Sequence, residues 1–147
     1  MKHVFLISIL LTVCYSCQKE DQATIDENRI LSYIEANSLD ATATGTGLHY
    51  VISEQGTGQQ PLASSTVKVA YKGYYTDGSV FDQSDNTGIS FSLAQVIAGW
   101  TEGIPFFKEG GKGVLLIPSA LGYGSQGSGG IPGNAVLIFD VHLIEVL

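Results

Sequence analysis

The sequence predicts an α+β domain in which an antiparallel sheet closes its apolar face over one short helix. Two observations support this prediction. Segments in the second half of the chain alternate apolar and polar residues, as half-buried strands do, and only residues 95–107 offer a helix there. All 18 glycines lie at or after Gly45, which separates a turn-rich part from a glycine-free stretch over residues 21–44. A chain of 147 residues has room for one such domain and a short appendage.

The appendage begins with a targeting signal. Lys2 and His3 precede an apolar run over residues 4–13, which is too short to span a bilayer as a mature helix. A positive start, a short apolar stretch and small residues near its end are typical of a secretory signal. We therefore assign residues 1–16 to a signal peptide that is removed from the mature protein.

The only two cysteines, Cys14 and Cys17, lie at the end of this signal. A Cys-x-x-Cys pair is compatible with a redox or zinc site, but no second pair and no nearby histidine adds ligands. We favour Cys17, which follows Ser16, as the lipidated first residue of a bacterial lipoprotein. This predicts a protein of the cell envelope, lipid-anchored in the outer membrane and facing the periplasm or the outside. The folded part then holds no cysteine, so its stability depends on its core and not on disulfides.

Residues 17–47 are expected to comprise the lipidated N-terminus, a linker and a short helix. Thr24 and Glu27 have the spacing of a capping box, which satisfies two free backbone N–H groups at a helix start. A modest apolar stripe follows on one helical face, formed by Ile30, Leu31 and Ile34. Two interpretations are open: a spacer or dimerisation arm, and, as we prefer, an amphipathic helix lying on the domain. Residues 40–47, rich in Ala, Thr and Gly, are expected to be a flexible tether.

Strands and turns fill the rest of the chain, residues 48–147. Residues 66–76 alternate Val67, Val69 and Tyr71 with polar or small residues, which predicts a half-buried strand. Asp77-Gly78 favours a hairpin, because glycine tolerates the positive φ of the turn. Further strands are expected at residues 80–82, 89–93, 112–117 and 139–145. The segment 112–117 is apolar on both faces, as a central strand with cover on each side would be.

The charge of the chain bears on its partners. It has 14 acidic and 7 basic side chains, and its formal net charge is −7. A net-negative domain repels phosphate backbones, so we expect no nucleic acid partner.

Five short motifs stand out: four place an aromatic or aliphatic residue beside a turn former or a single acid, and one combines apolar and small residues with a tryptophan. In order they are Phe81-Asp82, Val96-Ile97-Ala98-Gly99-Trp100, Tyr123-Gly124, Ile131-Pro132 and Phe139-Asp140. Trp100 is the only tryptophan, and a large rigid ring among apolar residues suits the floor of a pocket. In this order the motifs resemble the FKBP-type peptidyl-prolyl cis-trans isomerases over residues 48–147. The resemblance implies a twisted antiparallel sheet of five or six strands wrapped round one short helix.

The resemblance also implies the residues of a substrate pocket: Tyr71, Phe81, Asp82, Ile89, Val96, Ile97, Trp100, Tyr123, Ile131 and Phe139. Four of them are the catalytic candidates, namely Tyr71, Asp82, Tyr123 and Phe139. Taken singly, such rings are more often ordinary core residues. Ile89 stands where the family often has phenylalanine, so that wall should be slimmer. No arginine lies between Asp82 and Ile89, so Asp82 should depend on tyrosine hydroxyls. Residues 125–130 hold three glycines and no large side chain, which predicts weak selection of the residue before proline.

The implied reaction requires few chemical groups from the protein. Rotation about an X-Pro amide faces a barrier of roughly 18–20 kcal/mol, and the twisted amide is less solvated than the planar one. An apolar site with a few fixed donors suffices, so we expect no metal and no cofactor. The expected partners are proline-containing folding clients outside the cytoplasm and macrolide inhibitors, bound by a monomer or a dimer. The missing arginine and the thin loop leave an alternative, a catalytically weak holdase or assembly factor of the same fold.

Overall fold

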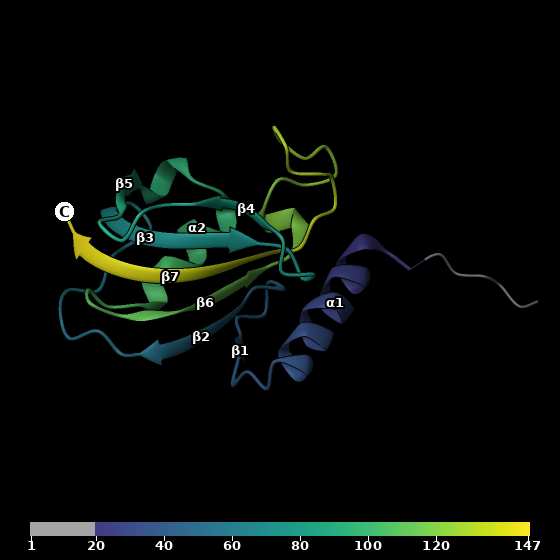
Figure 1. Cartoon of the computed structure of the whole chain (residues 1–147), viewed down its shortest axis with the longest axis horizontal. Coiled ribbons are helices and arrows are strands. Elements are labelled where there is room, and N and C mark those ends of the chain that lie inside the picture. Colours follow the sequence, from purple (N-terminus) through teal and green to yellow (C-terminus); the bar gives the residue numbers. More distant parts are fainter. Residues whose placement is uncertain (1–19) are drawn as a thin grey trace, which may run out of the picture.

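A computed structural model describes residues 20–147 of the chain (Figure 1). The predictions for residues 1–19, which include the signal peptide and Cys17, lie outside this range. Over the described residues the chain forms seven strands: β1 (Thr42–Ala43), β2 (His49–Glu54), β3 (Thr66–Tyr74), β4 (Val80–Gln83), β5 (Ile89–Ser92), β6 (Lys112–Ile117) and β7 (Leu137–Val146). It also forms two α-helices, α1 (Gln22–Ala36) and α2 (Ala98–Gly103), and three 3-10 turns, Leu93–Gln95, Ile104–Phe106 and Ser119–Leu121. Within residues 20–147, no helix combines the length and the apolar character needed to cross a membrane.

The strands pair in the order β1-β2-β6-β7-β3-β4, and β5 pairs with β3. All these pairs are antiparallel, and β7 lies between β6 and β3 along most of its length. The predicted α+β class and the sheet wrapped round a short helix are therefore confirmed. The strand count exceeds the expected five or six because the two-residue β1 extends one edge.

The alternation of the sequence matches the burial of the strands. Val67 and Val69 of β3 are fully buried, as is Leu143 of β7, whereas Asp140 of β7 is exposed. The predicted turn joins β3 to β4, with Gly78 at φ +86°. The Tyr75 N–H donates to the Ser79 carbonyl at 3.0 Å. Period-two patterning and the Asp-Gly turn thus specify this hairpin locally.

Strand β6 is covered on both faces, as its apolar sequence predicts. Leu115 and Ile117 belong to the main core, which also contains Trp100 of α2. Leu116 points the other way and packs with Ile30 of α1 and Val136. Two helices on opposite faces of one strand explain why no polar alternation appears in it.

Helix α2 is shorter than the predicted helical segment 95–107, because 3-10 turns form both of its flanks. It lies very close to β6. A Cβ added at Gly99 would stand 2.5 Å from Ile117 Cγ2, and one at Gly103 would stand 2.7 Å from Leu115 Cδ2. The two glycines therefore let the helix approach the sheet and place Trp100 against it.

Helix α1 lies on the domain, as the preferred interpretation states, but its details differ from the prediction. Asp21 is the N-cap, and its Oδ1 accepts from the Thr24 N–H at 2.8 Å, so the capping box of Thr24 and Glu27 is wrong. The apolar stripe is also narrower than expected. Ile30 is fully buried, but Leu31 is 47% exposed. Successive residues of a helix point in different directions, so the side chain of Leu31 faces away from the sheet.

The tether predicted over residues 40–47 is wrong, since this segment is tied to the domain. Thr42 and Ala43 pair with β2, and the Thr44 N–H donates to the Leu48 carbonyl at 3.0 Å. The Thr46 hydroxyl donates to Glu102 Oε1 on α2 at 2.8 Å. Composition alone indicated flexibility, whereas hydrogen bonds to distant residues order the segment.

Candidate functional site

A pocket of about 450 Å³ opens between α2, the strands β3, β4, β5 and β7, and the segment that precedes β7. Its lining is mostly aromatic and aliphatic: Tyr71, Phe81, Asp82, Phe91, Gln95, Val96, Ile97, Trp100, Tyr123, Ile131 and Phe139. The structure thus brings together nine of the ten residues predicted from the sequence. Trp100 and Phe139 are each only 4% exposed, so they form the buried base of the pocket.

The rings of the pocket pack edge to face around the indole of Trp100. Its centroid lies 5.2 Å from that of Tyr71, 5.3 Å from that of Phe139 and 5.4 Å from that of Phe91. The interplanar angles of these three pairs are 86°, 80° and 80°. Such pairs are worth about 0.5–1.5 kcal/mol each beyond their area burial. The edge-to-face network therefore fixes the shape of the base before any ligand binds.

Gly73 of β3 makes room for two of these rings. A Cβ at this position would stand 2.6 Å from Phe81 Cζ and 2.8 Å from Phe139 Cε1. The rings of Phe81 and Phe139 themselves meet edge to face at 5.5 Å. Because Gly73 has no side chain, the rings of Phe81 and Phe139 can pack close to β3 and leave the pocket open.

Asp82 is the one carboxylate of the lining, and Tyr71 is its hydrogen-bond partner. The Tyr71 hydroxyl donates to Asp82 Oδ2 at 2.7 Å. Burial raises the pKa of Tyr71 to about 12, and the bond to Asp82 adds to the effect. The phenol therefore stays protonated and keeps donating at neutral pH. The expectation that Asp82 depends on a tyrosine in place of an arginine is confirmed.

The start of α2 brings Val96 and Ile97 to the rim of the pocket. The Ile97 carbonyl accepts from the N–H groups of Trp100 and Thr101, at 2.9 and 3.2 Å. The Thr101 hydroxyl donates to the Leu93 carbonyl at 2.6 Å, which ties α2 to the preceding turn. Ile97 precedes α2, and among the described residues no backbone carbonyl accepts a hydrogen bond from its N–H group. This N–H is therefore free to bind a carbonyl oxygen of a ligand.

The opposite rim comes from the glycine-rich segment between β6 and β7. Tyr123 and Ile131 line the pocket, and Tyr123 is 37% exposed. A second hollow of about 510 Å³ lies beside the first and shares Phe81, Asp82 and Ile131 with it. Its other lining residues are Tyr75, Ser79, Val80, Ser128 and Gly130. The two hollows therefore adjoin along the three lining residues that they share.

The prediction for Ile89 is wrong. Its side chain is 45% exposed and lies outside the lining of the pocket. Ile89 begins β5, an edge strand that pairs only with β3, so it has sheet neighbours on one side only. Phe91, two residues further along the same face, supplies the ring instead. The alternation of β5 already placed Phe91 on that face, but the sequence did not show where along the strand the pocket lies.

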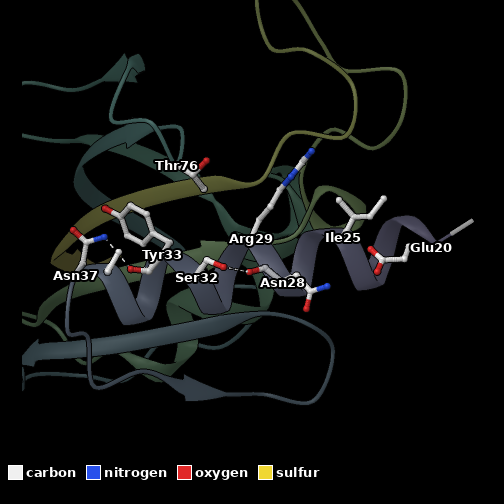
Figure 2. A pocket seen from close by; sticks show the side chains of 9 residues that line it. Glu20, Ile25, Asn28, Arg29, Ser32, Tyr33, Asn37 and Thr76 are labelled. Atoms are coloured by element: carbon white, nitrogen blue, oxygen red, sulfur yellow. Dashed lines mark hydrogen bonds between the residues drawn. The ribbon is translucent and has the colours of Figure 1, made fainter.

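Two other hollows have different linings. One, of about 520 Å³, runs along α1 and reaches Thr76 of the β3–β4 turn (Figure 2). Ser32 and Asn37, two of its polar side chains, donate to the Asn28 and Tyr33 carbonyls of the same helix. The other, of about 690 Å³, lies over the outer face of the sheet and is lined largely by polar and charged side chains. The aromatic pocket is therefore the candidate site.

Comparison with known proteins agrees with this geometry. The family model described as FKBP-type peptidyl-prolyl cis-trans isomerase matches residues 57–144. The chain belongs to the FKBP-type peptidyl-prolyl cis-trans isomerase family. The matched residues run from the loop after β2 almost to the end of β7 and include the whole lining of the pocket.

Two curated members of the family illustrate the similarity. The chain is 45% identical over 118 residues to the FKBP-type peptidyl-prolyl cis-trans isomerase FkpA of Aeromonas hydrophila, covering 78% of this chain and 44% of the relative. It is 44% identical over 131 residues to FkpA of Escherichia coli strain K12, covering 86% of this chain and 48% of the relative. The chain thus spans about half the length of the curated relatives it matches.

Solved structures of the family have the same fold. A crystal structure of FkpA from Escherichia coli matches with a TM-score of 0.75 at 43% identity, over 84% of this chain and 60% of that one. A peptidyl-prolyl cis-trans isomerase from Pseudomonas syringae matches with a TM-score of 0.72 at 30% identity, over 87% of this chain and 98% of that one.

Proposed function

We propose that the chain catalyses cis-trans isomerisation of X-Pro peptide bonds in polypeptide clients by non-covalent stabilisation of the twisted amide. The observation that supports this best is the open pocket of about 450 Å³ over the buried Trp100 indole, walled by rings and holding one carboxylate. An apolar site of this kind favours the less solvated twisted amide over the planar one. The proposal needs no bond making, no metal and no cofactor.

Each group has a part in the proposed reaction. The proline ring lies on the Trp100 indole, with Phe139 as the back wall. The Ile97 N–H and the Tyr123 hydroxyl donate to carbonyl oxygens of the bound peptide. Asp82, oriented by the 2.7 Å bond from Tyr71, faces the amide that rotates. Fixed polar groups in a dry site cost little reorganisation when the amide twists, which is why a few suffice.

The adjoining hollow extends the site along the client chain. Tyr75 and Val80 on one side and Gly130 and Ile131 on the other leave room for side chains next to the proline. The small residues of the segment 125–130 make few contacts there, so the proposed enzyme accepts many residues before proline.

We also propose where the protein acts. A signal peptide over residues 1–16 and lipidation of Cys17 would anchor it in the outer membrane, with residues 18–47 leading into the domain. Its clients would be proline-containing proteins of the cell envelope, whose folding is slowed by proline isomerisation over 10–100 s. A macrolide that buries an apolar ring over Trp100 would compete with these clients. Labelling of intact cells with a lipid precursor, compared with a Cys17→Ser variant, tests the anchor.

A protease-coupled assay on a proline tetrapeptide, with residues 18–147 as the enzyme, tests the proposed activity. We expect catalysis above the spontaneous rate, inhibited by a macrolide. Asp82→Asn should lower kcat/KM by about 10- to 100-fold, less than the roughly 10²- to 10³-fold cost of removing a fixed polar group from a closed site, because Asp82 is exposed.

Asp140→Asn is the matched control for this experiment. Asp140 also accepts from a tyrosine, at 2.8 Å from the Tyr74 hydroxyl, but it lies on the outer face of the sheet. Its variant should keep full activity. Two results together would favour a holdase of the same fold over an isomerase. In the first, the unmodified protein does not raise the isomerisation rate above the spontaneous one. In the second, it protects a client from aggregation, and the Asp82→Asn variant protects it equally well.

A further inference from the structure

Helix α1 contacts the residues that flank both ends of the segment that carries Tyr123. We call residues 122–133 the Tyr123 loop; it begins after the 3-10 turn Ser119–Leu121 and ends before Asn134. The loop supplies Tyr123 and Ile131 to the rim of the pocket. In Figure 1 it projects from the sheet on the side where α1 lies.

The first contact is made by a buried carboxylate. Asp26 of α1 is 1% exposed, and its Oδ2 accepts from both the backbone N–H and the hydroxyl of Ser119, at 2.8 and 2.5 Å. Its Oδ1 accepts from Gln22 Nε2 at 2.7 Å. Burying a carboxylate is costly unless it is hydrogen-bonded, and these three donors offset that cost. The bond therefore fixes Ser119, itself 3% exposed, relative to α1.

Ser119 in turn holds the backbone of the residues on either side of Tyr123. Its carbonyl accepts from the N–H of Gly122 at 3.0 Å and from the N–H of Gly124 at 2.8 Å. Tyr123 lies between these two glycines. Its backbone is therefore held by one carbonyl, whose own residue is held by Asp26.

The far end of the loop is tied to the same helix. Arg29 Nη1 donates to the Asn134 carbonyl at 3.3 Å, and the Asn134 N–H donates to the Gly124 carbonyl at 2.8 Å. Figure 2 shows the Arg29 side chain reaching from α1 toward the chain that precedes β7. Ile30, the residue after Arg29, is buried against Leu116 of β6 and Val136 near the start of β7.

We propose that Asp26 is a positioning residue for isomerisation, and that α1 holds the Tyr123 loop in its working place through Ser119. Asp26 does not line the pocket, so it acts only through the loop. The inference rests on the proposed isomerase function for its kinetic consequence. Its structural part, the anchoring of the loop by α1, stands on the contacts alone.

The test compares Asp26→Asn with the unmodified protein by hydrogen exchange and kinetics. Asp26→Asn should speed exchange at the Gly122 and Gly124 amides by about tenfold while the sheet amides stay protected. It should lower kcat/KM by about tenfold, since small misplacement of a binding group is costly. Tyr123→Phe should lower kcat/KM less in the Asp26→Asn background than in the native one, because the hydroxyl is already misplaced there.

Glu27→Gln is the matched control, because Glu27 is the next residue of α1 and its Oε1 lies 3.6 Å from His49 Nε2 rather than near the loop. It should change neither exchange at the glycines nor kcat/KM. If Asp26→Asn does not fold, Ser119→Ala replaces it. That variant loses only the hydroxyl bond, and it should shift the same amides and kcat/KM in the same direction by a smaller factor.

Two results would overturn the inference. One is exchange at Gly122 and Gly124 unchanged, or raised no more than in the sheet. The other is an equal cost of Tyr123→Phe in both backgrounds, which makes Asp26 a stabilising residue without a positioning role. An unmodified protein that does not catalyse isomerisation would remove the proposed function but not the anchoring, which the exchange of the two glycine amides measures independently.

Discussion

The two sides of the pocket are built in different ways. Tyr71, Phe81, Trp100 and Phe139 come from strands or α2, and their rings contact one another edge to face. Tyr123 and Ile131 come from a loop with five glycines over residues 122–130, whose main ties run through Ser119 and Asn134 to α1. The first side is fixed by the packing of the core, the second by a few hydrogen bonds at its ends.

Because of this difference, substitutions on the two sides of the pocket should affect the stability of the fold differently. Changes on the strand side should cost free energy of unfolding as well as activity, because the same rings form the core and the pocket. Changes on the loop side should leave the free energy of unfolding nearly unchanged, and they should alter activity only where they remove a group that contacts the client. Each of the following predictions tests that contrast.

The largest effect is expected for Phe139→Ala. Phe139 is 4% exposed and contacts the rings of Tyr71, Phe81 and Trp100, so its removal should lower the free energy of unfolding by about 3–5 kcal/mol. Denaturant unfolding measures this loss. Phe106→Ala is the control, since Phe106 is 38% exposed and, among the rings of residues 20–147, stacks only on Tyr50, at 4.4 Å. An equal loss in both variants would contradict the shared role of Phe139 in core and pocket.

A smaller loss is expected for Gly73→Ala. The new Cβ would meet the rings of Phe81 and Phe139 at 2.6 and 2.8 Å, so the rings must move toward the pocket. Overpacking of this kind costs about 1–3 kcal/mol, and binding of a proline peptide should weaken as well. Quenching of Trp100, the single tryptophan, reports that binding.

Gly130→Ala provides the loop-side counterpart of this experiment. A Cβ at Gly130 would meet no atom within 4 Å, so neither stability nor peptide affinity should fall appreciably. Equal effects of the two alanines on Trp100 quenching would show that the strand side is as adaptable as the loop.

Tyr123→Phe should affect activity alone. Tyr123 is 37% exposed and loses only its hydroxyl, so the free energy of unfolding should change by less than about 0.5 kcal/mol. The proposed loss of one hydrogen bond to the client should lower kcat/KM about fivefold, in line with a net contribution of about 1 kcal/mol. Denaturant unfolding and the tetrapeptide assay on the same variant test both expectations. An unchanged kcat/KM would show that the Tyr123 hydroxyl does not bind the client.

The last prediction concerns an effect confined to alkaline pH. The pKa of Tyr71 is about 12 in the folded protein, above the value of about 10 for a free phenol. The folded state holds this proton more tightly, so the stability it contributes is complete below pH 10 and is lost as pH rises through 12. Unfolding curves should therefore fall less steeply over this range in Tyr71→Phe. The same slope in both proteins would contradict the raised pKa.

Local chemistry in the sequence determined the hairpin and the strand faces, whereas nine residues of the pocket followed from the resemblance of the motifs to a known family. Period-two alternation fixes which face of β3 or β7 is buried, and a glycine at φ +86° specifies the turn after Tyr75. The motif order then allowed the rings to be assigned to one site. The patterns that set the hairpin and the strand faces are each contained within a few neighbouring residues, whereas the motif order runs from Phe81 to Asp140.

Tertiary structure alone decided the rest. Whether Ile89 or Phe91 reaches the pocket depends on where an edge strand ends relative to α2, and the flexible composition of residues 40–47 gave no sign of their pairing with β2. The contact of Asp26 with Ser119 joins residues 93 positions apart in the sequence. Such a bond depends on where two elements come to lie in space, which no local pattern encodes.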